Sequence, residues 1–523
     1  MEGADAAIAA TSSPGTKKLV VLYPLPGMDH LVSMIELGKI LGAWGLTVTI
    51  EIPFTIPTTP NSGSHPPSPY SHQVRVGTMA PPVDNATLLA KLEEMTKGIK
   101  ETSLKQDETN RKIEGMQQSI NRISYEQGEM KTWKPQLETK VTELQNSVTD
   151  LKLKEAVAFE VISISNPHLR EILVAVDPGV LVVDFFCCIV LGVAWELSVP
   201  SYFFFTFGAE VAAFFLYLPV LHERLTVDFQ DMGDKLVHVP GIPPFRAPHA
   251  MLPLMEREDA AYEGFLKVST ELCSTNGIIV NTFRWLERRA VETVAAGHCR
   301  PPGLQTPSLY CIGPLIKSEE VVGKGGKECL AWLDAQPKES VVSLCFGSIG
   351  RFSAKQIREV ASGLEASGQR FLWVVRAPPS DDPAKKFEKP PEPDLDELLP
   401  ERFLARTKDR GLVVKSWASQ RDVLAHPSVG GFVTHCGWNS VLEAVPMLAW
   451  PLYAEQRLNR VFLEKELKLA VAVEGYDNDK ELVAAKEVAA KVRWLLESDG
   501  GMVLRACTKE ATLAGLVDEW RRA

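Results

Sequence analysis

The chain has 523 residues, enough for two or three domains that each bury a sizeable core. Its 45% hydrophobic and 23% charged residues are typical of a globular protein, and a net charge of −10 excludes a broad basic surface for nucleic acid or anionic lipid. The nine cysteines have no regular spacing, which indicates reduced thiols rather than a disulfide framework.

Neither the first residues of the chain nor its most apolar part suggests a secreted or membrane protein. Residues 1–18 are small and polar and lack the apolar run of a secretory signal. Charged residues interrupt the apolar region 179–220, so it offers no uninterrupted membrane span. Two buried parallel strands with a helix between them explain this region better. We therefore expect a cytoplasmic protein without a membrane span.

The first predicted elements form a strand–helix–strand unit. Residues 18–24 are a short apolar run, 31–44 an amphipathic helix and 46–50 a second strand, which together predict a doubly wound α/β domain. His30 falls between the first strand and the helix, where such sheets place ligands. A single histidine in this position is more often a helix cap or a surface residue.

A proline-, serine- and threonine-rich loop over 51–84 precedes a segment of different character. Apolar residues recur every three or four positions from Leu88 to Leu151, which predicts a coiled coil of about nine heptads. Pro135 should kink it. Two interpretations remain open for this insertion: a solvent-exposed helical excursion without a role, or an arm for self-association.

The α/β pattern then resumes. It predicts helices from 162 and 208 and over 262–274 and 285–295, with strands over 180–183, 201–205 and 277–281. Asp184 ends a buried strand, where a carboxylate needs a partner or caps the next helix. Phe204, Phe205 and Phe215 are predicted to be core residues. The glycine-containing stretch 316–327 is the predicted interdomain linker.

The second half repeats this alternation. The pattern predicts helices over 328–335, 354–367 and 484–496, and strands over 341–346, 371–375, 412–415, 430–434 and 469–473. We place a first domain at 18–315, with the coiled coil 88–151 inserted in it, and a second domain at 328–505. A tail helix is expected over 506–523.

The strongest motif lies within residues 417–459. The strand over 430–434 runs into His435 and then a short helix, so that free backbone N–H groups and side-chain donors meet at one point. Such a point suits a phosphate, and Glu443, about one turn along the helix, suits a ribose hydroxyl. Trp417 offers a flat face for a base.

The spacings W-x-x-Q, HCGWNS-x-x-E and E-Q-x-x-N in this stretch resemble the signature of plant secondary-product UDP-glycosyltransferases. The resemblance covers residues 18–84 and 158–523. It implies the α/β fold class GT-B, in which two Rossmann-like domains face each other across a cleft. It also implies inverting transfer of glucose from UDP-glucose to a hydroxyl of a small lipophilic acceptor, such as a phenolic or a flavonoid.

The resemblance implies a role for each matching residue of the donor site. Trp417 is expected to stack on uracil, Gln420 and the backbone of Ala418 to fix that ring's edge, and Glu443 to bind the ribose. The residues expected near the diphosphate are Ser348, His435, Gly437, Trp438, Asn439 and Ser440. Glu455 and Gln456 are expected on the sugar side, where a glutamine usually accompanies UDP-glucose, and Tyr453 and Ala454 are also expected to bind the donor.

For catalysis the resemblance implies that His30 is the general base and that Asp184 pairs with it. Asp29 stands where the family usually has a glycine, which could raise the pKa of His30 and crowd the acceptor. No metal or cofactor is expected, since UDP-glucose is a co-substrate and no cluster of ligands has metal spacing.

Three departures from the family pattern leave alternatives open. Glu443, Ala444 and Val445 run directly into Pro446 without the extra residues that relatives carry, the coiled coil is inserted, and the tail is shortened. A degenerate copy with weak or no activity would show such changes. An interaction protein whose coiled coil is the working part is the third hypothesis.

Overall fold

The computed structural model describes residues 19–23, 37–38, 41, 46–50, 169–315, 324–380, 391–443, 446–476 and 482–510. The candidate base His30, the predicted coiled coil 88–151 and the tail from 511 lie outside these ranges. All described residues belong to one compact unit, made of 1–61 and 150–523.

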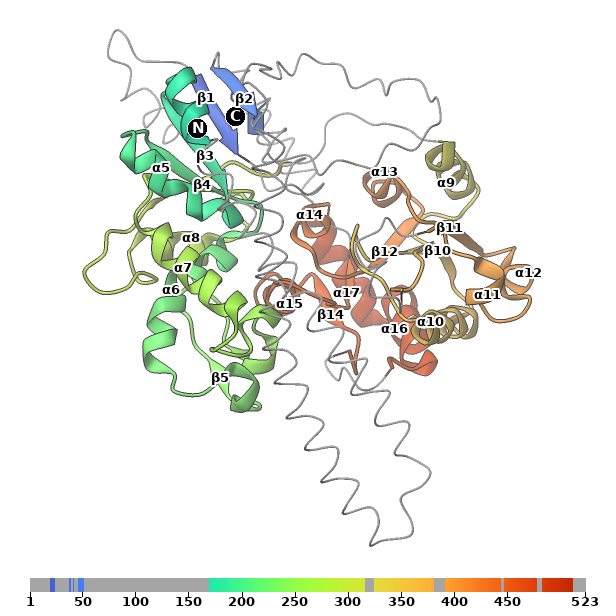
Figure 1. Cartoon of the computed structure of the whole chain (residues 1–523). Coiled ribbons are helices and arrows are strands. Elements are labelled where there is room, and N and C mark those ends of the chain that lie inside the picture. Colours follow the sequence, from blue (N-terminus) through green and yellow to red (C-terminus); the bar gives the residue numbers. More distant parts are fainter. Residues whose placement is uncertain are drawn as a thin grey trace, which may run out of the picture. The chain divides into compact units, whose positions relative to one another are not determined.

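The first sheet has six strands in the order β2-β1-β3-β4-β7-β8, and every neighbouring pair is parallel (Figure 1). The strand order reverses between β1 and β3, which makes their carboxyl ends the place where such sheets bind ligands. The strands are β1 (Leu19–Tyr23), β2 (Thr47–Ile50), β3 (Val180–Asp184), β4 (Ser201–Phe205), β7 (Gly277–Val280) and β8 (Ser308–Cys311).

Aromatic side chains fill the space between this sheet and its helices. The rings of Phe185 and Phe205 lie 4.7 Å apart, as do those of Phe185 and Phe215. Phe204, Phe205 and Phe215 are fully buried, which confirms the prediction that they are core residues. The helices are η1 (Phe185–Val190), α5 (Leu191–Glu196), α6 (Ala209–Arg224), α7 (Ala260–Leu272) and α8 (Arg288–Ala295).

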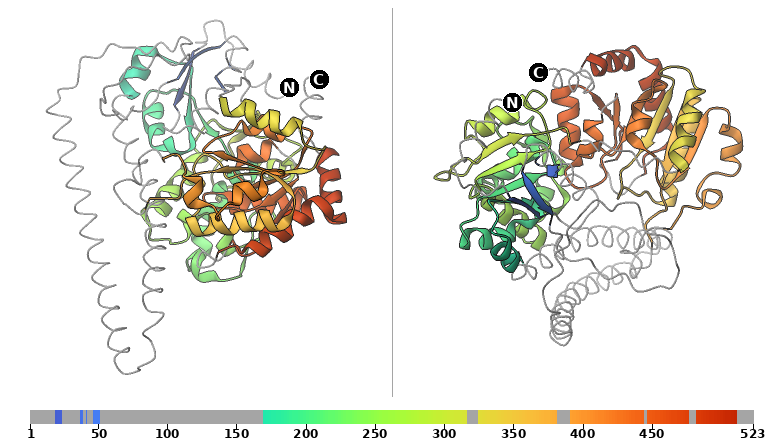
Figure 2. Two further views of the ribbon diagram at one scale, coloured as in Figure 1. Left: turned by 90° about the vertical axis from the view of Figure 1, so that its right-hand side faces the viewer. Right: turned by 90° about the horizontal axis from the view of Figure 1, so that it is seen from above.

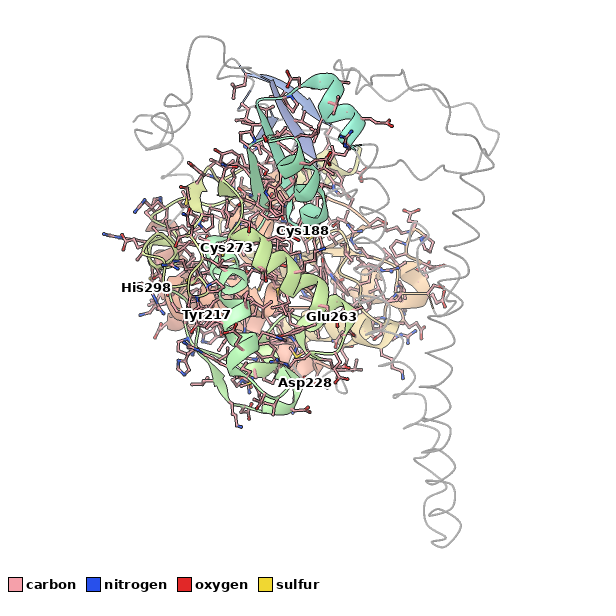
Figure 3. All side chains as sticks on the ribbon, turned by 60° about the vertical axis from the view of Figure 1, so that its left-hand side comes forward. Cys188, Tyr217, Asp228, Glu263, Cys273 and His298 are labelled. Atoms are coloured by element: carbon pink, nitrogen blue, oxygen red, sulfur yellow. The ribbon has the colours of Figure 1, made fainter. Side chains whose placement is uncertain are left out.

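Figure 3 shows how these helices meet. Helix α7 packs on α6 and on η1. In Figure 3 the label Cys273 marks the C-terminal end of α7, and the label Cys188 marks η1. Shorter elements connect α6 to α7: η2 (Phe229–Met232), the hairpin of β5 (Leu236–Val237) and β6 (Phe245–Arg246), η3 (Ala247–His249) and η4 (Leu252–Leu254).

The second sheet is also parallel, in the order β11-β10-β9-β12-β13-β14. This is the dinucleotide-binding order, with its reversal between β9 and β12. The strands and helices of this sheet are coloured yellow to red in Figure 2. The strands are β9 (Val341–Cys345), β10 (Arg370–Val375), β11 (Gly411–Lys415), β12 (Val429–Thr434), β13 (Met447–Ala449) and β14 (Ala470–Ala472).

Both faces of the second sheet are buried, as its apolar strands predict. Alternate residues of β10 join different cores: Phe371, Trp373 and Val375 pack with α10 and α16, whereas Leu372 and Val374 pack with α9 and α13. The helices are α9 (Lys324–Asp334), α10 (Ala354–Ser367), α11 (Leu395–Leu398), α12 (Phe403–Thr407), α13 (Gln420–Leu424), α14 (Trp438–Leu442), α15 (Gln456–Phe462), the π-helix η6 (Leu463–Leu467), α16 (Ala485–Glu497) and α17 (Asp499–Glu510).

The bounds of several elements differ from the predictions, and one strand was not predicted. Helix α9 begins at Lys324, so the last part of the predicted linker is helical despite its glycines. Strand β8 was not predicted, because its four residues are all at least partly exposed and carry no apolar alternation. Helix α17 begins at Asp499 and runs across the expected start of the tail at 506.

The two sheets share parts of their cores. Leu458 and Val461 of α15 pack among the core residues of the first sheet, and Leu286 from the first half packs in the core of the second. A polar contact adds to this shared packing, since Arg457 of α15 donates a hydrogen bond to the carbonyl oxygen of Pro248 at 2.8 Å. Helix α15 is therefore attached to the first sheet, although its sequence follows β13 of the second.

Two further observations concern the cysteines and the lengths of the helices. All nine cysteines are free thiols, as predicted. Within the described ranges, no helix combines the length and the apolar character needed to cross a membrane.

Candidate active site

The candidate donor site begins at the strand-order reversal of the second sheet. Strands β9 and β12 pair in parallel, with Cys345 opposite Thr434, so the residues that follow them emerge at the same edge. Gly347 and Ser348 follow β9, and His435 follows β12. Gly347 has φ +75°, a left-handed conformation that glycine adopts without strain.

The imidazole of His435 is held between two glycines. A Cβ on either Gly347 or Gly437 would stand 2.5 Å from Nε2, so both positions need glycine for the ring to lie where it does. His435 is buried, and its Nδ1 has no hydrogen-bond partner. Burial and the positive charge of Arg376 lower the pKa of His435 to about 4, so the ring is neutral near pH 7. A buried nitrogen without a partner is a feature of ligand sites.

Helix α14, which follows His435, has only five residues. So short a helix carries little of the macrodipole expected from the sequence, and an anion here would depend on individual donors. Asn439 is exposed, whereas Ser440 is buried. Trp438 is expected near the diphosphate, but its indole N–H is bonded to the carbonyl oxygen of Asn281 at 2.7 Å. Its backbone N–H is the part that remains for a ligand.

Gln420, Ser440 and Glu443 form a hydrogen-bonded cluster. The Gln420 Nε2 group donates to Ser440 Oγ at 3.0 Å and to Glu443 Oε2 at 2.7 Å. Burial raises the pKa of Glu443, although the hydrogen bond from Gln420 and the charge of Arg421 oppose that shift. The structure thus brings the residues expected at the uracil edge, the phosphate and the ribose into one group.

Trp417 and Ala418 lie at the start of α13, next to this cluster in sequence. The Trp417 side chain is 50% exposed, which leaves a large aromatic face open to solvent. Ala418 is buried. An exposed indole beside a polar cluster is suited to stacking on a flat ring.

The expected sugar side adjoins His435. The rings of Tyr453 and His435 have centroids 6.0 Å apart. The side-chain oxygen of Gln456 accepts from the backbone N–H groups of Leu452 and Tyr453, at 2.9 and 3.0 Å, which fixes the loop before α15. Ala454 in that loop has φ +52°.

The side chain of Asn459 fixes the carboxylate of Glu455. The carboxylate accepts a hydrogen bond from the Asn459 amide at 3.1 Å, and that amide also donates to the carbonyl oxygen of Cys436 at 2.9 Å. Asn459 therefore ties the sugar-side loop to the turn that carries His435. Glu455 and Gln456 are both buried.

Asp184 is fully buried at the end of β3. Its Oδ1 accepts from the backbone N–H of Phe186 at 3.2 Å, which is the helix-capping role that the sequence left open. Strands β1 and β3 are neighbours, with Tyr23 opposite Val183, so Asp184 lies at the edge toward which β1 leads. Its pairing with His30 lies outside the described residues.

Sequence reasoning missed two buried polar residues that connect to this site. The Glu287 carboxylate accepts from the backbone N–H groups of Ala209 and Glu210, each at 2.8 Å, and so caps α6 from 78 positions away. Asn281 bonds to both Trp438 and Asn439. Neither residue belongs to a local pattern, because each acts on a segment distant in the chain.

The described ranges hold no group of three or more histidine, cysteine, aspartate or glutamate residues arranged to hold a metal ion. The polar groups of the candidate donor site are hydrogen-bond donors together with the carboxylates of Glu443 and Glu455.

Comparison with known proteins agrees with this geometry. Residues 319–488 match the family model for UDP-glucoronosyl and UDP-glucosyl transferases. A phloretin 2'-O-glucosyltransferase from Malus domestica is 39% identical over 95% of both chains, and an anthocyanidin 5,3-O-glucosyltransferase from a Rosa hybrid cultivar is 40% identical over 95% of this chain and 94% of its own. The structure of Phytolacca americana UGT2 complexed with UDP-2fluoro-glucose and pterostilbene has a TM-score of 0.67 and 30% identity, covering 94% of this chain and 93% of that one. The chain belongs to the UDP-glycosyltransferase family and has its GT-B fold.

Proposed function

We propose that this protein transfers glucose from UDP-glucose to a hydroxyl of a phenolic or flavonoid-like acceptor, with inversion at the anomeric carbon. The named activities of the relatives support this substrate class, since they act on phloretin and on anthocyanidins. The related Phytolacca structure holds a UDP-glucose analogue together with pterostilbene.

One observation carries the proposal: the five-residue helix α14 connects the cluster of Gln420, Ser440 and Glu443 to the His435 ring that two glycines hold in place. A nucleoside diphosphate needs an acceptor for its ribose and several donors for its phosphates. The cluster supplies the first through Glu443. The donors for the phosphates come from His435, Ser440, Asn439 and the backbone N–H groups of the turn.

In the proposed reaction the acceptor hydroxyl gives its proton to His30 as its oxygen attacks the anomeric carbon. The bond from that carbon to the phosphate oxygen breaks, and UDP leaves with the negative charge. Asp184 orients His30 and stabilises its protonated form. Neutral His435 donates a hydrogen bond to the diphosphate, where charge grows during the step.

The alternative of a degenerate copy rests largely on the short connection after Glu443. In the structure Glu443 still ends α14 within reach of Gln420, at 2.7 Å. The short connection therefore leaves the cluster assembled, which supports the active enzyme.

Calorimetric titration of the protein with UDP tests the donor site. We expect Glu443→Ala to weaken UDP by about 10- to 100-fold, the effect of removing a charged hydrogen-bond partner. Glu365→Ala is the matched control, because Glu365 pairs with Arg406 on the surface of the same domain and should leave UDP affinity unchanged. Equal affinities of wild type and Glu443→Ala would refute the assignment of Glu443.

We further propose a cytoplasmic location and self-association through residues 88–151, both on the sequence pattern. Light scattering of the full chain and of a variant lacking 88–151 tests the second point. The association hypothesis fails if both have the mass of a single chain.

A further inference from the structure

Asn281 connects the first sheet to the donor-site helix. It directly follows β7, is fully buried, and makes three hydrogen bonds to segments far away in the chain. Its carbonyl oxygen accepts from the Trp438 indole at 2.7 Å, its Oδ1 accepts from the backbone N–H of Leu315 at 2.7 Å, and its Nδ2 donates to Asn439 Oδ1 at 3.3 Å.

These bonds determine the orientation of two amide groups. A backbone N–H can only donate, so the atom of Asn281 that faces Leu315 must be the oxygen. The NH2 group of Asn281 then faces Asn439, and the atom of Asn439 that meets it must also be an oxygen. The NH2 group of exposed Asn439 is left on the side away from Asn281.

We infer that Asn281 is a positioning residue for the donor: through Asn439 it ensures that an NH2 group, and not a carbonyl oxygen, faces the diphosphate. This inference rests on the proposed function, in which Asn439 contacts the diphosphate. An amide that is free to rotate would present its oxygen to the anion part of the time, and that orientation is repulsive. The hydrogen bonds from Leu315 to Asn281 and from Asn281 to Asn439 fix the orientation of the Asn439 amide before the donor binds.

Asn281→Asp tests the inference with almost no change in shape. One carboxylate oxygen still accepts from Leu315, and the backbone bond to Trp438 does not involve the side chain. The second oxygen of an ionised carboxylate can only accept, so at a pH that keeps this carboxylate charged Asn439 must turn its NH2 group toward it and its own oxygen toward the ligand. We expect UDP to bind about 10- to 100-fold more weakly, and uridine, which has no phosphate, to bind nearly as before.

Two further variants separate this role from simpler explanations. Asn276→Asp is the matched control, because Asn276 lies at the other end of β7 and its Oδ1 also accepts from a backbone N–H, that of Ser201 at 2.9 Å. It should leave UDP affinity unchanged. In an Asn439→Ala background, Asn281→Asp should have no additional effect on UDP affinity, since the residue through which it acts is absent.

Each outcome decides a different point. If Asn439→Ala binds UDP as tightly as wild type, the proposed diphosphate site fails at this residue and the inference fails with it. If Asn439→Ala weakens UDP but Asn281→Asp does not, only the inference fails. It also fails if Asn281→Asp weakens UDP and uridine equally, or if its effect persists in the Asn439→Ala background, because the acidic charge or a disturbed fold would then be the cause.

Discussion

The α-carbon of Gly347 lies so close to the His435 ring that a Cβ there would stand 2.5 Å from Nε2. Gly347→Ala should therefore displace the imidazole from the candidate diphosphate site. We expect UDP affinity to fall at least about 10-fold, the effect of losing a hydrogen bond to a charged ligand. Calorimetric titration with UDP measures the change.

Gly368→Ala provides the control for backbone strain. Gly368 caps α10 with φ +72°, nearly the φ of Gly347, but a Cβ there would meet no atom within 4 Å. Alanine at 368 should cost about 1 kcal/mol of stability and leave UDP affinity intact. Equal losses of affinity in the two variants would show that strain, and not contact with His435, causes the effect.

Asp184→Asn separates the two roles of Asp184. Asparagine caps helices as well as aspartate does, so the hydrogen bond from Phe186 and the fold should survive. The negative charge that would orient His30 is lost, and kcat should fall by about 100-fold or more with UDP affinity unchanged. If kcat stays near the wild-type value, Asp184 serves the fold alone.

Glu287 makes stability depend on pH. Burial raises its pKa from 4.5 to about 7, so between these values the folded protein keeps a proton that the unfolded chain has released. The free energy of unfolding should therefore fall by about 3 kcal/mol as the pH rises through this range. Denaturant unfolding at several pH values, with Glu287→Gln as comparison, measures this contribution. Parallel pH profiles for the two proteins would contradict it.

His435 should change the free energy of unfolding in the opposite direction over nearly the same pH range. Its pKa is lowered from 6.5 to about 4, so the unfolded chain takes up a proton that the folded protein refuses. Its contribution to the free energy of unfolding is fully present above pH 6.5 and falls by about 3 kcal/mol as the pH drops to 4. His435→Gln should remove this loss. We expect the Gln variants at 287 and 435 to change the pH dependence of the free energy of unfolding, relative to wild type, in opposite directions.

Elements with a strong local pattern were predictable from the sequence. Helix α10 matches its predicted range of 354–367 to the residue, because Ser353 caps its start and Gly368 ends it. Strands β4 and β9 were found as apolar runs that both faces of a sheet bury. The edge strand β8 has no such run, and packing alone makes it a strand.

The candidate donor site could be proposed from the sequence for a related reason: all its residues except Ser348 lie within 417–459, where their spacing is informative. Their hydrogen-bond partners were not. Asn281 and Glu287 act on residues 158 and 78 positions away, and nothing in their own neighbourhoods distinguishes them from an ordinary strand end and an ordinary helix acid. Because Asn281 is so distant in the chain, the motif did not reveal its bond to the indole of Trp438, a residue expected near the diphosphate.

The attachment of α15 limits how this enzyme can be recombined with its relatives. Leu458 and Val461 are core residues of the first sheet, yet the same helix begins at Gln456, on the expected sugar side. A chimera joined at the linker would combine α15 of one parent with a first-sheet core shaped for the other. Exchanges of sugar preference between parents should therefore succeed only when residues 456–462 are inherited together with residues 169–315.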